Sequence, residues 1–248
     1  MRPDPYAWSL NAEALLGLTV LAGVYAASAR RFPRSPSRIA AFAAAVALLA
    51  ATEVTPLHAL SFHLLSMHLL QNVVLAEWAP ALLVLGVTPA AAAALGRSPV
   101  VRVLTWPPAA LALWLATYFA WHVPAAYDAA LRRPDSLLHL EHTSYVAAGC
   151  LVWWPVLQNA PHRLSPGGRA SYLFAAFVLA SPLGLLLALL PDSIYDYYDG
   201  SGLWGLSPLT DQQIAGVTMA GEQAIVFFAA FAWFFFRFLA EQERDPHA

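Results

Sequence analysis

Residues 61–84 of the 248-residue chain read SFHLLSMHLLQNVVLAEWAPALLV. The stretch is predominantly apolar over the length that an α-helix needs to cross a bilayer, about 20 residues. It also contains side chains that are costly in the membrane interior, namely His63, His68 and Glu77. Ionisable groups inside a membrane are rare and mark candidate functional positions. We therefore interpret this stretch as a transmembrane helix that contributes polar side chains to a functional site.

The whole chain has the composition of a membrane protein. It is 59% hydrophobic and only 11% charged, whereas soluble domains carry about 25% charged residues. The net charge of −2 gives no reason to expect a nucleic-acid partner. Because Cys150 is the single cysteine, there is no intramolecular disulfide and no CxxC motif. The composition predicts an all-α, polytopic integral membrane protein with one transmembrane helical domain over residues 1–248.

Seven segments are candidates for membrane-spanning helices, in contact with the lipid bilayer. They are residues 10–29, 39–54, 61–84, 100–121, 138–157, 169–190 and 212–239. The second is the weakest, because its apolar run is short and ends before Thr52 and Glu53. Pro80 predicts a kink in the third segment, and Pro107-Pro108 predict a bend or a restart in the fourth.

The arginines predict the orientation of these helices. All 13 basic residues are arginines. With seven spans and the N-terminus outside, ten fall on the inner side: Arg30, Arg31, Arg34, Arg38, Arg97, Arg102, Arg163, Arg169, Arg237 and Arg244. Three fall outside: Arg2, Arg132 and Arg133. Because positive charge collects on the cytoplasmic side, we predict an outer N-terminus and an inner C-terminus.

This topology places six of the eight histidines near the outer face: His58, His63, His68, His122, His139 and His142. His139 and His142 are three residues apart, so they can point to one ligand from one helix. Adding His68 and His122 gives three or four nitrogens, the usual number for a copper or zinc site. Glu141 is a candidate acceptor for an imidazole N–H.

Other polar or soft side chains lie within the predicted spans. Met67 and Met219 carry thioethers that suit Cu(I), although packing is the more ordinary role of methionine. Glu77 and Glu222 lie near the middle of the membrane, where an isolated charge is costly. We expect these two glutamates to be paired, protonated or lining a polar cavity.

Several of these residues belong to motifs that together resemble a known family, the CtaG-type cytochrome c oxidase assembly factors. The motifs are Ser66–Asn72, Ala79–Gly86, His122–Leu131, His139–His142, Trp153–Leu157 and Asp211–Met219. The resemblance extends from about residue 58 to 240, which is nearly the whole chain.

The resemblance implies a multi-pass protein of the bacterial plasma membrane that helps to mature a haem-copper oxidase by handling copper. Its partners would be subunits of a terminal oxidase and the copper ion. By position, His68, His122, His139 and His142 match the histidines of the family. Relatives often carry a second histidine after the glutamine, where this chain has Asn72. An asparagine amide is a poor copper ligand, so His63 or Met67 are the candidate substitutes, with Asn72 and Glu141 supporting the ligands.

Three other functions are compatible with the residues. Two histidines on facing helices could hold a haem for electron transfer. Glu77 and Glu222 could serve a transporter, although the internal repeats common in transporters are not visible. The protein could also be a structural membrane chaperone without a metal. We find no nucleophile motif and no phosphate-binding glycine loop, so we expect no enzymatic activity.

Overall fold

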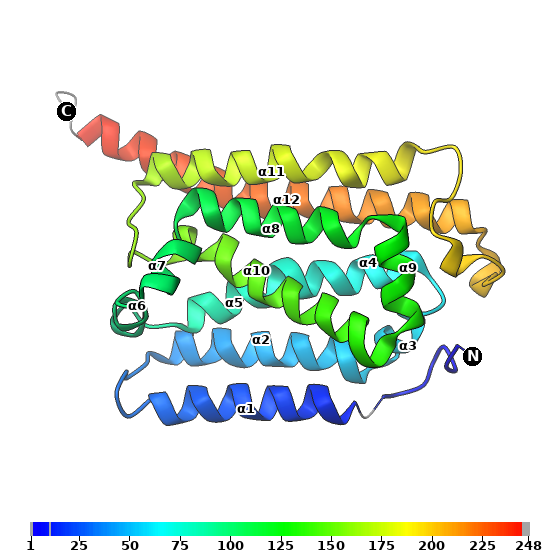
Figure 1. Cartoon of the computed structure of the whole chain (residues 1–248). Coiled ribbons are helices and arrows are strands. Elements are labelled where there is room, and N and C mark those ends of the chain that lie inside the picture. The colour runs from blue at the N-terminus through cyan, green and yellow to red at the C-terminus, as the bar shows by residue number, and fades with distance from the viewer. Residues whose placement is uncertain (1, 10, 245–248) are drawn as a thin grey trace.

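A computed structural model describes residues 2–9 and 11–244, and every regular element in this part of the chain is helical (Figure 1). The longer helices run roughly parallel, except that α9 turns away from α8. They are α1 (Ala12–Ser28), α2 (Pro36–Val54), α4 (Leu65–Val73), α5 (Ala79–Gly86), α8 (Pro107–Trp121), α9 (Pro124–Arg132), α10 (His139–Leu157), α11 (Pro166–Leu189) and α12 (Pro208–Arg244). The short connecting helices are α3 (Pro56–Ser61), α6 (Pro89–Leu95) and α7 (Pro99–Leu104). Two π-turns, η1 (Val74–Trp78) and η2 (Pro134–Leu138), and two 3₁₀-turns, η3 (Asp196–Tyr198) and η4 (Leu203–Gly205), complete the set.

Among the described residues, four helical stretches are long and apolar enough to cross a membrane: α2, the continuous stretch Leu65–Gly86, α11 and α12. The pair α8 and α9 is bent by 73° and would bring the number to five if it counts as one span. Helix α1 is apolar but has only 17 residues. These helices confirm the all-α class and indicate a membrane protein. The seven-span topology and the orientation of the termini stay predictions.

The prolines define most helix starts. Pro107 begins α8 after α7 has ended at Leu104, so the predicted segment 100–121 is two helices, with the restart that Pro107-Pro108 indicated. In the third segment, the π-turn η1 ends at Trp78, two residues before Pro80. Proline lacks an amide hydrogen and its ring crowds the carbonyl four residues earlier, which favours a widened turn at this point.

The third and first predicted segments also differ at their starts. Residues 61–64 are not part of α4, which begins at Leu65, because the chain leaves the short helix α3 at Ser61. The predicted start of the first segment, residue 10, lies outside the described residues. Helix α1 begins at Ala12, where the Asn11 side chain accepts hydrogen bonds from the amides of Glu13 and Ala14, both at 3.1 Å. Such a cap satisfies amides that have no partner within the helix.

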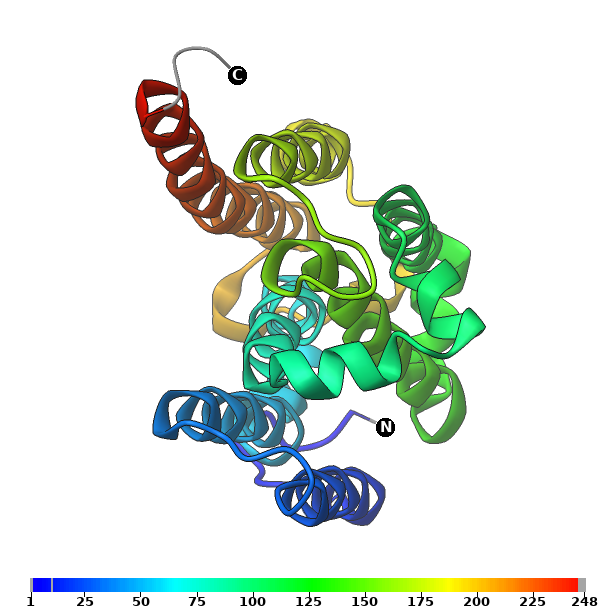
Figure 2. The same cartoon turned by 90° about the vertical axis from the view of Figure 1, so that its left-hand side faces the viewer.

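Glycines set the closest helix contacts. A Cβ on Gly216 of α12 would lie 2.5 Å from the Ala188 amide nitrogen of α11. A Cβ on Gly149 of α10 would lie 2.3 Å from the Ala76 carbonyl oxygen in η1. Small residues allow such close approach between membrane helices. They bring α10 against the stretch Leu65–Gly86 at the centre of the molecule, whereas α1 lies at the edge beside α2 and has no fully buried residue (Figures 1 and 2).

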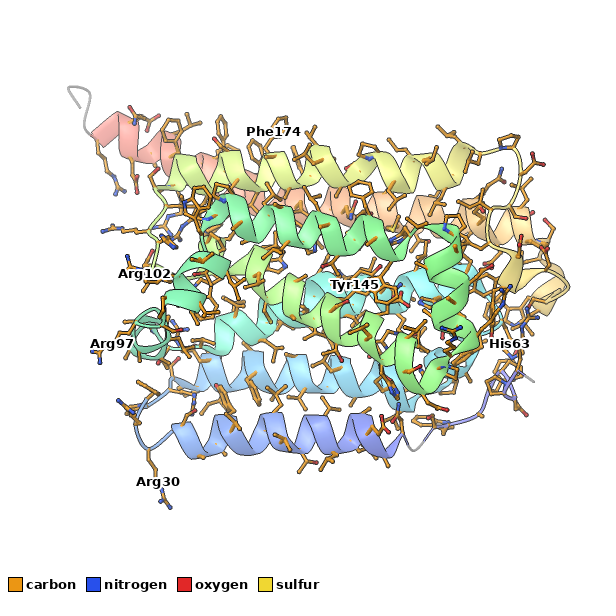
Figure 3. The ribbon with its side chains drawn as sticks, in the orientation of Figure 1. Arg30, His63, Arg97, Arg102, Tyr145 and Phe174 are labelled. Carbon is orange, nitrogen blue, oxygen red and sulfur yellow. The ribbon has the colours of Figure 1, made fainter. Side chains whose placement is uncertain are left out.

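The two ends of the helix bundle differ in chemistry. Figure 3 shows Arg30, Arg97 and Arg102 at one end of the molecule and His63 at the opposite end. This separation fits the predicted asymmetry of charge, in which most arginines share one membrane face. The histidine site described next lies toward the end that carries His63.

Candidate functional site

A buried carboxylate on α10 joins two side chains of α4. His68 and Asn72 are four residues apart on α4 and therefore share one helix face. The Nε2 atom of His68 lies 3.3 Å from Glu141 Oε1, and the Asn72 amide donates to the same oxygen at 3.0 Å. All three side chains are buried. Three atoms of this cluster have no hydrogen-bond partner: His68 Nδ1, Glu141 Oε2 and Asn72 Oδ1. Each can offer a lone pair to a ligand.

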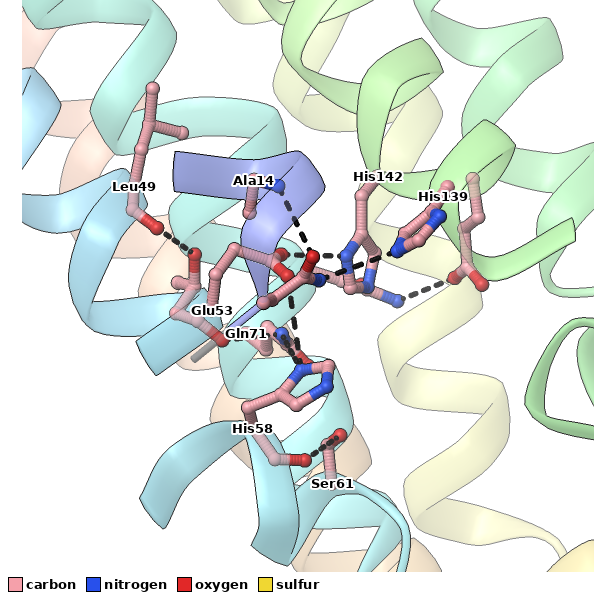
Figure 4. A network of polar contacts seen from close by, with 12 residues as sticks. Ala14, Leu49, Glu53, His58, Ser61, Gln71, His139 and His142 are labelled. Atoms are coloured by element: carbon pink, nitrogen blue, oxygen red, sulfur yellow. Dashed lines mark hydrogen bonds and ion pairs between the residues drawn. The ribbon is translucent and has the colours of Figure 1, made fainter. Parts of the chain in front are cut away.

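A second carboxylate, Glu53 at the end of α2, joins two more imidazoles (Figure 4). The Nδ1 atom of His142 lies 2.8 Å from Glu53 Oε1, and the Nδ1 atom of His58 lies 3.9 Å from Glu53 Oε2. The Gln71 amide donates to the Thr52 carbonyl at 2.7 Å and lies 3.4 Å from His58 Nδ1. The two carboxylate clusters are neighbours.

The ring centroids of His68 and His142 are 6.2 Å apart, so the Glu141 and Glu53 clusters meet at these two imidazoles. His58 lies in α3, outside the candidate spans. Burial lowers the pKa of His58 below its ordinary value, and the nearby Glu53 carboxylate opposes this effect. The imidazole of His58 is therefore neutral at pH 7 and keeps a lone pair.

His139 lies at the first turn of α10, apart from the buried clusters. Its Nδ1 atom is 3.1 Å from Glu13 Oε2, and its Nε2 atom is 3.3 Å from the Asn11 side-chain nitrogen. A cavity of about 460 Å³ between α1, α2 and α10 is nevertheless lined by His139, His142, Glu13 and Glu53 together. The two histidines of α10 thus share a cavity while they contact different carboxylates.

His122 lies at the break between α8 and α9 and is also buried. Its Nδ1 atom is 2.7 Å from the Tyr118 carbonyl oxygen, which assigns the ring proton to Nδ1 and leaves Nε2 as the lone-pair nitrogen. That Nε2 atom has no partner. His122 lines a small internal cavity together with Asn72, Glu77 and Met219. Met219 therefore lines the same cavity as a histidine that has one ring nitrogen without a partner.

The candidate substitutes His63 and Met67 lie elsewhere. His63 Nε2 is 2.7 Å from the Pro3 carbonyl oxygen at the surface. Met67 is half-buried on α4. Within residues 2–9 and 11–244, neither side chain has a polar contact with the His68 or His142 clusters.

The two glutamates predicted near the middle of the membrane accept hydrogen bonds from neutral side chains. The Trp78 indole donates to Glu222 Oε1. The Gln223 amide donates to Glu77 Oε1 and to the Tyr118 hydroxyl, both at 3.1 Å. One oxygen of each glutamate has no partner.

Sequence reasoning missed Glu53 as a site residue. Its signal was visible, because Glu53 is an acidic residue directly at the end of an apolar segment. Its partners, His142 and His58, lie in other helices, so the sequence pattern did not connect them.

The described part of the chain contains no group of three or more His, Cys, Asp or Glu side chains already arranged to hold a metal ion. The free atoms are nonetheless suitable in type. His68 Nδ1, His122 Nε2 and His142 Nε2 are buried imidazole nitrogens without a partner, and imidazole nitrogen is a good ligand for copper.

The comparison with protein families assigns the chain to a known class. The sequence model of the family described as "Cytochrome c oxidase caa3 assembly factor (Caa3_CtaG)" matches residues 21–241. The chain belongs to this family of cytochrome c oxidase assembly factors. The match covers His68, His122, His139 and His142, and it confirms the resemblance seen in the motifs. No curated protein and no solved structure matches the chain.

Proposed function

We propose that this assembly factor binds copper through His68, His122, His139 and His142 and delivers it to a subunit of the oxidase. The observation that supports the proposal most strongly is the set of unpaired nitrogens. His68, His122 and His142 each leave one buried ring nitrogen without a partner. Buried polar atoms in proteins are nearly always satisfied, so three unpaired imidazole nitrogens, two of them on neighbouring rings, support a missing ligand.

The cavity beside α1 supports a route by which copper reaches these nitrogens. His139 is partly exposed and shares the cavity with His142, whereas His142 is next to His68. The carboxylates of Glu13 and Glu53 make the polar part of the cavity attractive to a cation. Copper would bind first at His139 and then move inward to His142 and His68.

The types of ligand atom near the site favour a soft metal ion over a hard one. Three imidazoles and the thioether of Met219 suit Cu(I), whereas a hard cation prefers oxygen ligands. We assign His63 and Met67 no role in this site. In this proposal the protein lies in the bacterial plasma membrane with the site toward the outer face, and its partners are subunits of a terminal oxidase.

Copper retention by the purified protein tests the proposal. The wild type, loaded with Cu(I) under anaerobic conditions and dialysed, should retain copper by elemental analysis. A variant with His68, His122 and His142 all replaced by Gln should not. A matched control is His162→Gln, because His162 lies at the arginine end, 2.7 Å from the Arg102 carbonyl oxygen. Equal copper in the wild type and the triple variant would overturn the proposal.

A cellular test separates copper delivery from a structural chaperone role. If the triple variant is made at normal levels, cells that carry it should lose oxidase activity. Full oxidase activity with a variant that no longer holds copper would reject delivery and would favour a chaperone without a metal.

A further inference from the structure

A second cavity lies at the opposite end of the bundle from the histidines. Its volume is about 750 Å³, and it lies between α1 and α2 on one side and α5, α6 and α10 on the other. Most of the side chains around it are apolar, among them Val24, Leu83 and Trp154. Three arginines line the same cavity: Arg31, Arg34 and Arg97. The cavity is therefore apolar along its length and cationic at one end.

Contacts within the protein hold one of these arginines in place. The guanidinium of Arg34 lies 3.7 Å from the centre of the Tyr25 ring and donates to the Ser28 hydroxyl. Tyr25 in turn stacks on Phe42, with ring centroids 3.6 Å apart. A guanidinium has five N–H donors, so Arg34 is oriented by these contacts and keeps donors for a ligand.

The three arginines lack acidic partners in the described part of the chain. The ion pairs that Asp and Glu side chains form there involve other groups, namely His58, His68, Arg132, His139 and His142. Uncompensated guanidinium groups at one end of a cavity attract an anion, and they match the oxygens of a phosphate particularly well. The apolar remainder of the cavity fits a hydrocarbon chain and does not suit a small hydrated anion.

We propose that this cavity binds an anionic phospholipid. The phosphate group lies against Arg31, Arg34 and Arg97, and an acyl chain lies between α1 and α5. Basic pockets between membrane helices on the arginine-rich side are a recognised setting for anionic lipid headgroups. Lipid binding in this cavity does not depend on copper, so it is tested independently of the proposed function.

The lipid would have a structural consequence for α1. This helix has no fully buried residue and packs mainly on α2 (Figure 2). Leu21 of α1 lines both the lipid cavity and the cavity of His139 and His142. A bound acyl chain would connect α1 to α5 and α10 and so fix the helix that closes the histidine cavity.

Native mass spectrometry with defined lipids tests the proposal. The purified wild type should retain phosphatidylglycerol and bind phosphatidylcholine much less. Replacing Arg31, Arg34 and Arg97 by Gln should reduce phosphatidylglycerol binding on the order of tenfold or more, because each arginine contributes to the attraction. A matched control replaces Arg30, Arg163 and Arg237 by Gln, which removes the same charge outside the cavity and should leave binding near the wild-type level.

A second variant tests the acyl chain without changing charge. Val24→Trp would fill the cavity from an exposed position on α1, so the fold should tolerate it. It should lower phosphatidylglycerol binding while all arginines remain. Equal binding by the cavity variant and the control variant, equal binding of phosphatidylcholine, or equal stabilisation by inorganic phosphate alone would each overturn the proposal.

Discussion

The Nδ1 atom of His142 on α10 lies 2.8 Å from the Glu53 Oε1 atom on α2, across 89 residues of sequence. A carboxylate that accepts the N–H of one ring nitrogen leaves the other nitrogen with its lone pair, as in many metal-binding histidines. In His142 that other nitrogen, Nε2, is buried and has no partner. Glu141 has the corresponding position for His68.

Replacing Glu53 tests this arrangement. Glu53→Gln should weaken Cu(I) binding by about 10- to 100-fold, because loss of a carboxylate behind a ligating histidine has effects of that size. Competition with a Cu(I) chelator measures the change. Glu241→Gln in the exposed end of α12 is the control and should bind as the wild type does. Unchanged affinity in Glu53→Gln would argue against His142 as a ligand.

Asn72 offers a gain-of-function test. Asn72→His places a second imidazole on the face of α4 that carries His68, so Cu(I) binding should become tighter. Asn72→Ala is the control, because it removes the amide that donates to Glu141 and adds no nitrogen. If both variants bind copper equally weakly, position 72 does not face the metal.

Gly149 tests the packing that brings α10 to α4. Gly149→Ala would place a methyl group 2.3 Å from the Ala76 carbonyl oxygen and 2.6 Å from Pro80 Cγ. Overpacking of this kind costs about 1–3 kcal/mol, so the melting temperature in detergent should fall by several degrees. Gly23→Ala has no atom within 4 Å of the new methyl group. It should leave the melting temperature unchanged or raise it slightly.

His58 predicts a pH dependence of the metal-free protein. Because burial lowers its pKa in the folded state, the unfolded state binds the proton more readily. Neutral His58 therefore contributes fully to the stability of the fold above the ordinary histidine pKa. This contribution is lost as the pH falls through the lowered pKa of the folded state. Glu53, His142, His68 and His139 are the ionisable groups that act on His58.

Melting curves between pH 7.5 and pH 5 measure this effect. The range is chosen to span the ordinary histidine pKa of about 6.5. The wild type should lose more stability on acidification than His58→Gln. His63→Gln, at the surface beside Pro3, should behave as the wild type does. Parallel curves for the wild type and His58→Gln would contradict the prediction.

The helices were predictable because their causes are local. Apolar length and proline chemistry act within a few residues, so the restart at Pro107 could be anticipated. At Pro80 a kink was predicted, whereas the structure has a π-turn within the continuous stretch Leu65–Gly86. The second segment was predicted to be the weakest because of Thr52 and Glu53. It is a continuous helix, since Thr52 bonds to the Leu49 carbonyl at 2.8 Å and Glu53 contacts His142.

The sequence by itself determined the all-helical class, the apolar segments, the separation of arginines from histidines and the family. Only the tertiary structure decided which histidines meet: His68 and His142 are neighbours, whereas His139 faces Glu13 and His122 lines a separate cavity with Met219. It also introduced Glu53 and the arginine-lined cavity. The reason is physical. The rotation of each helix about its own axis is fixed by contacts between residues far apart in the chain, such as those at Gly149 and Gly216. If a helix were rotated by one residue, its imidazoles would face different partners.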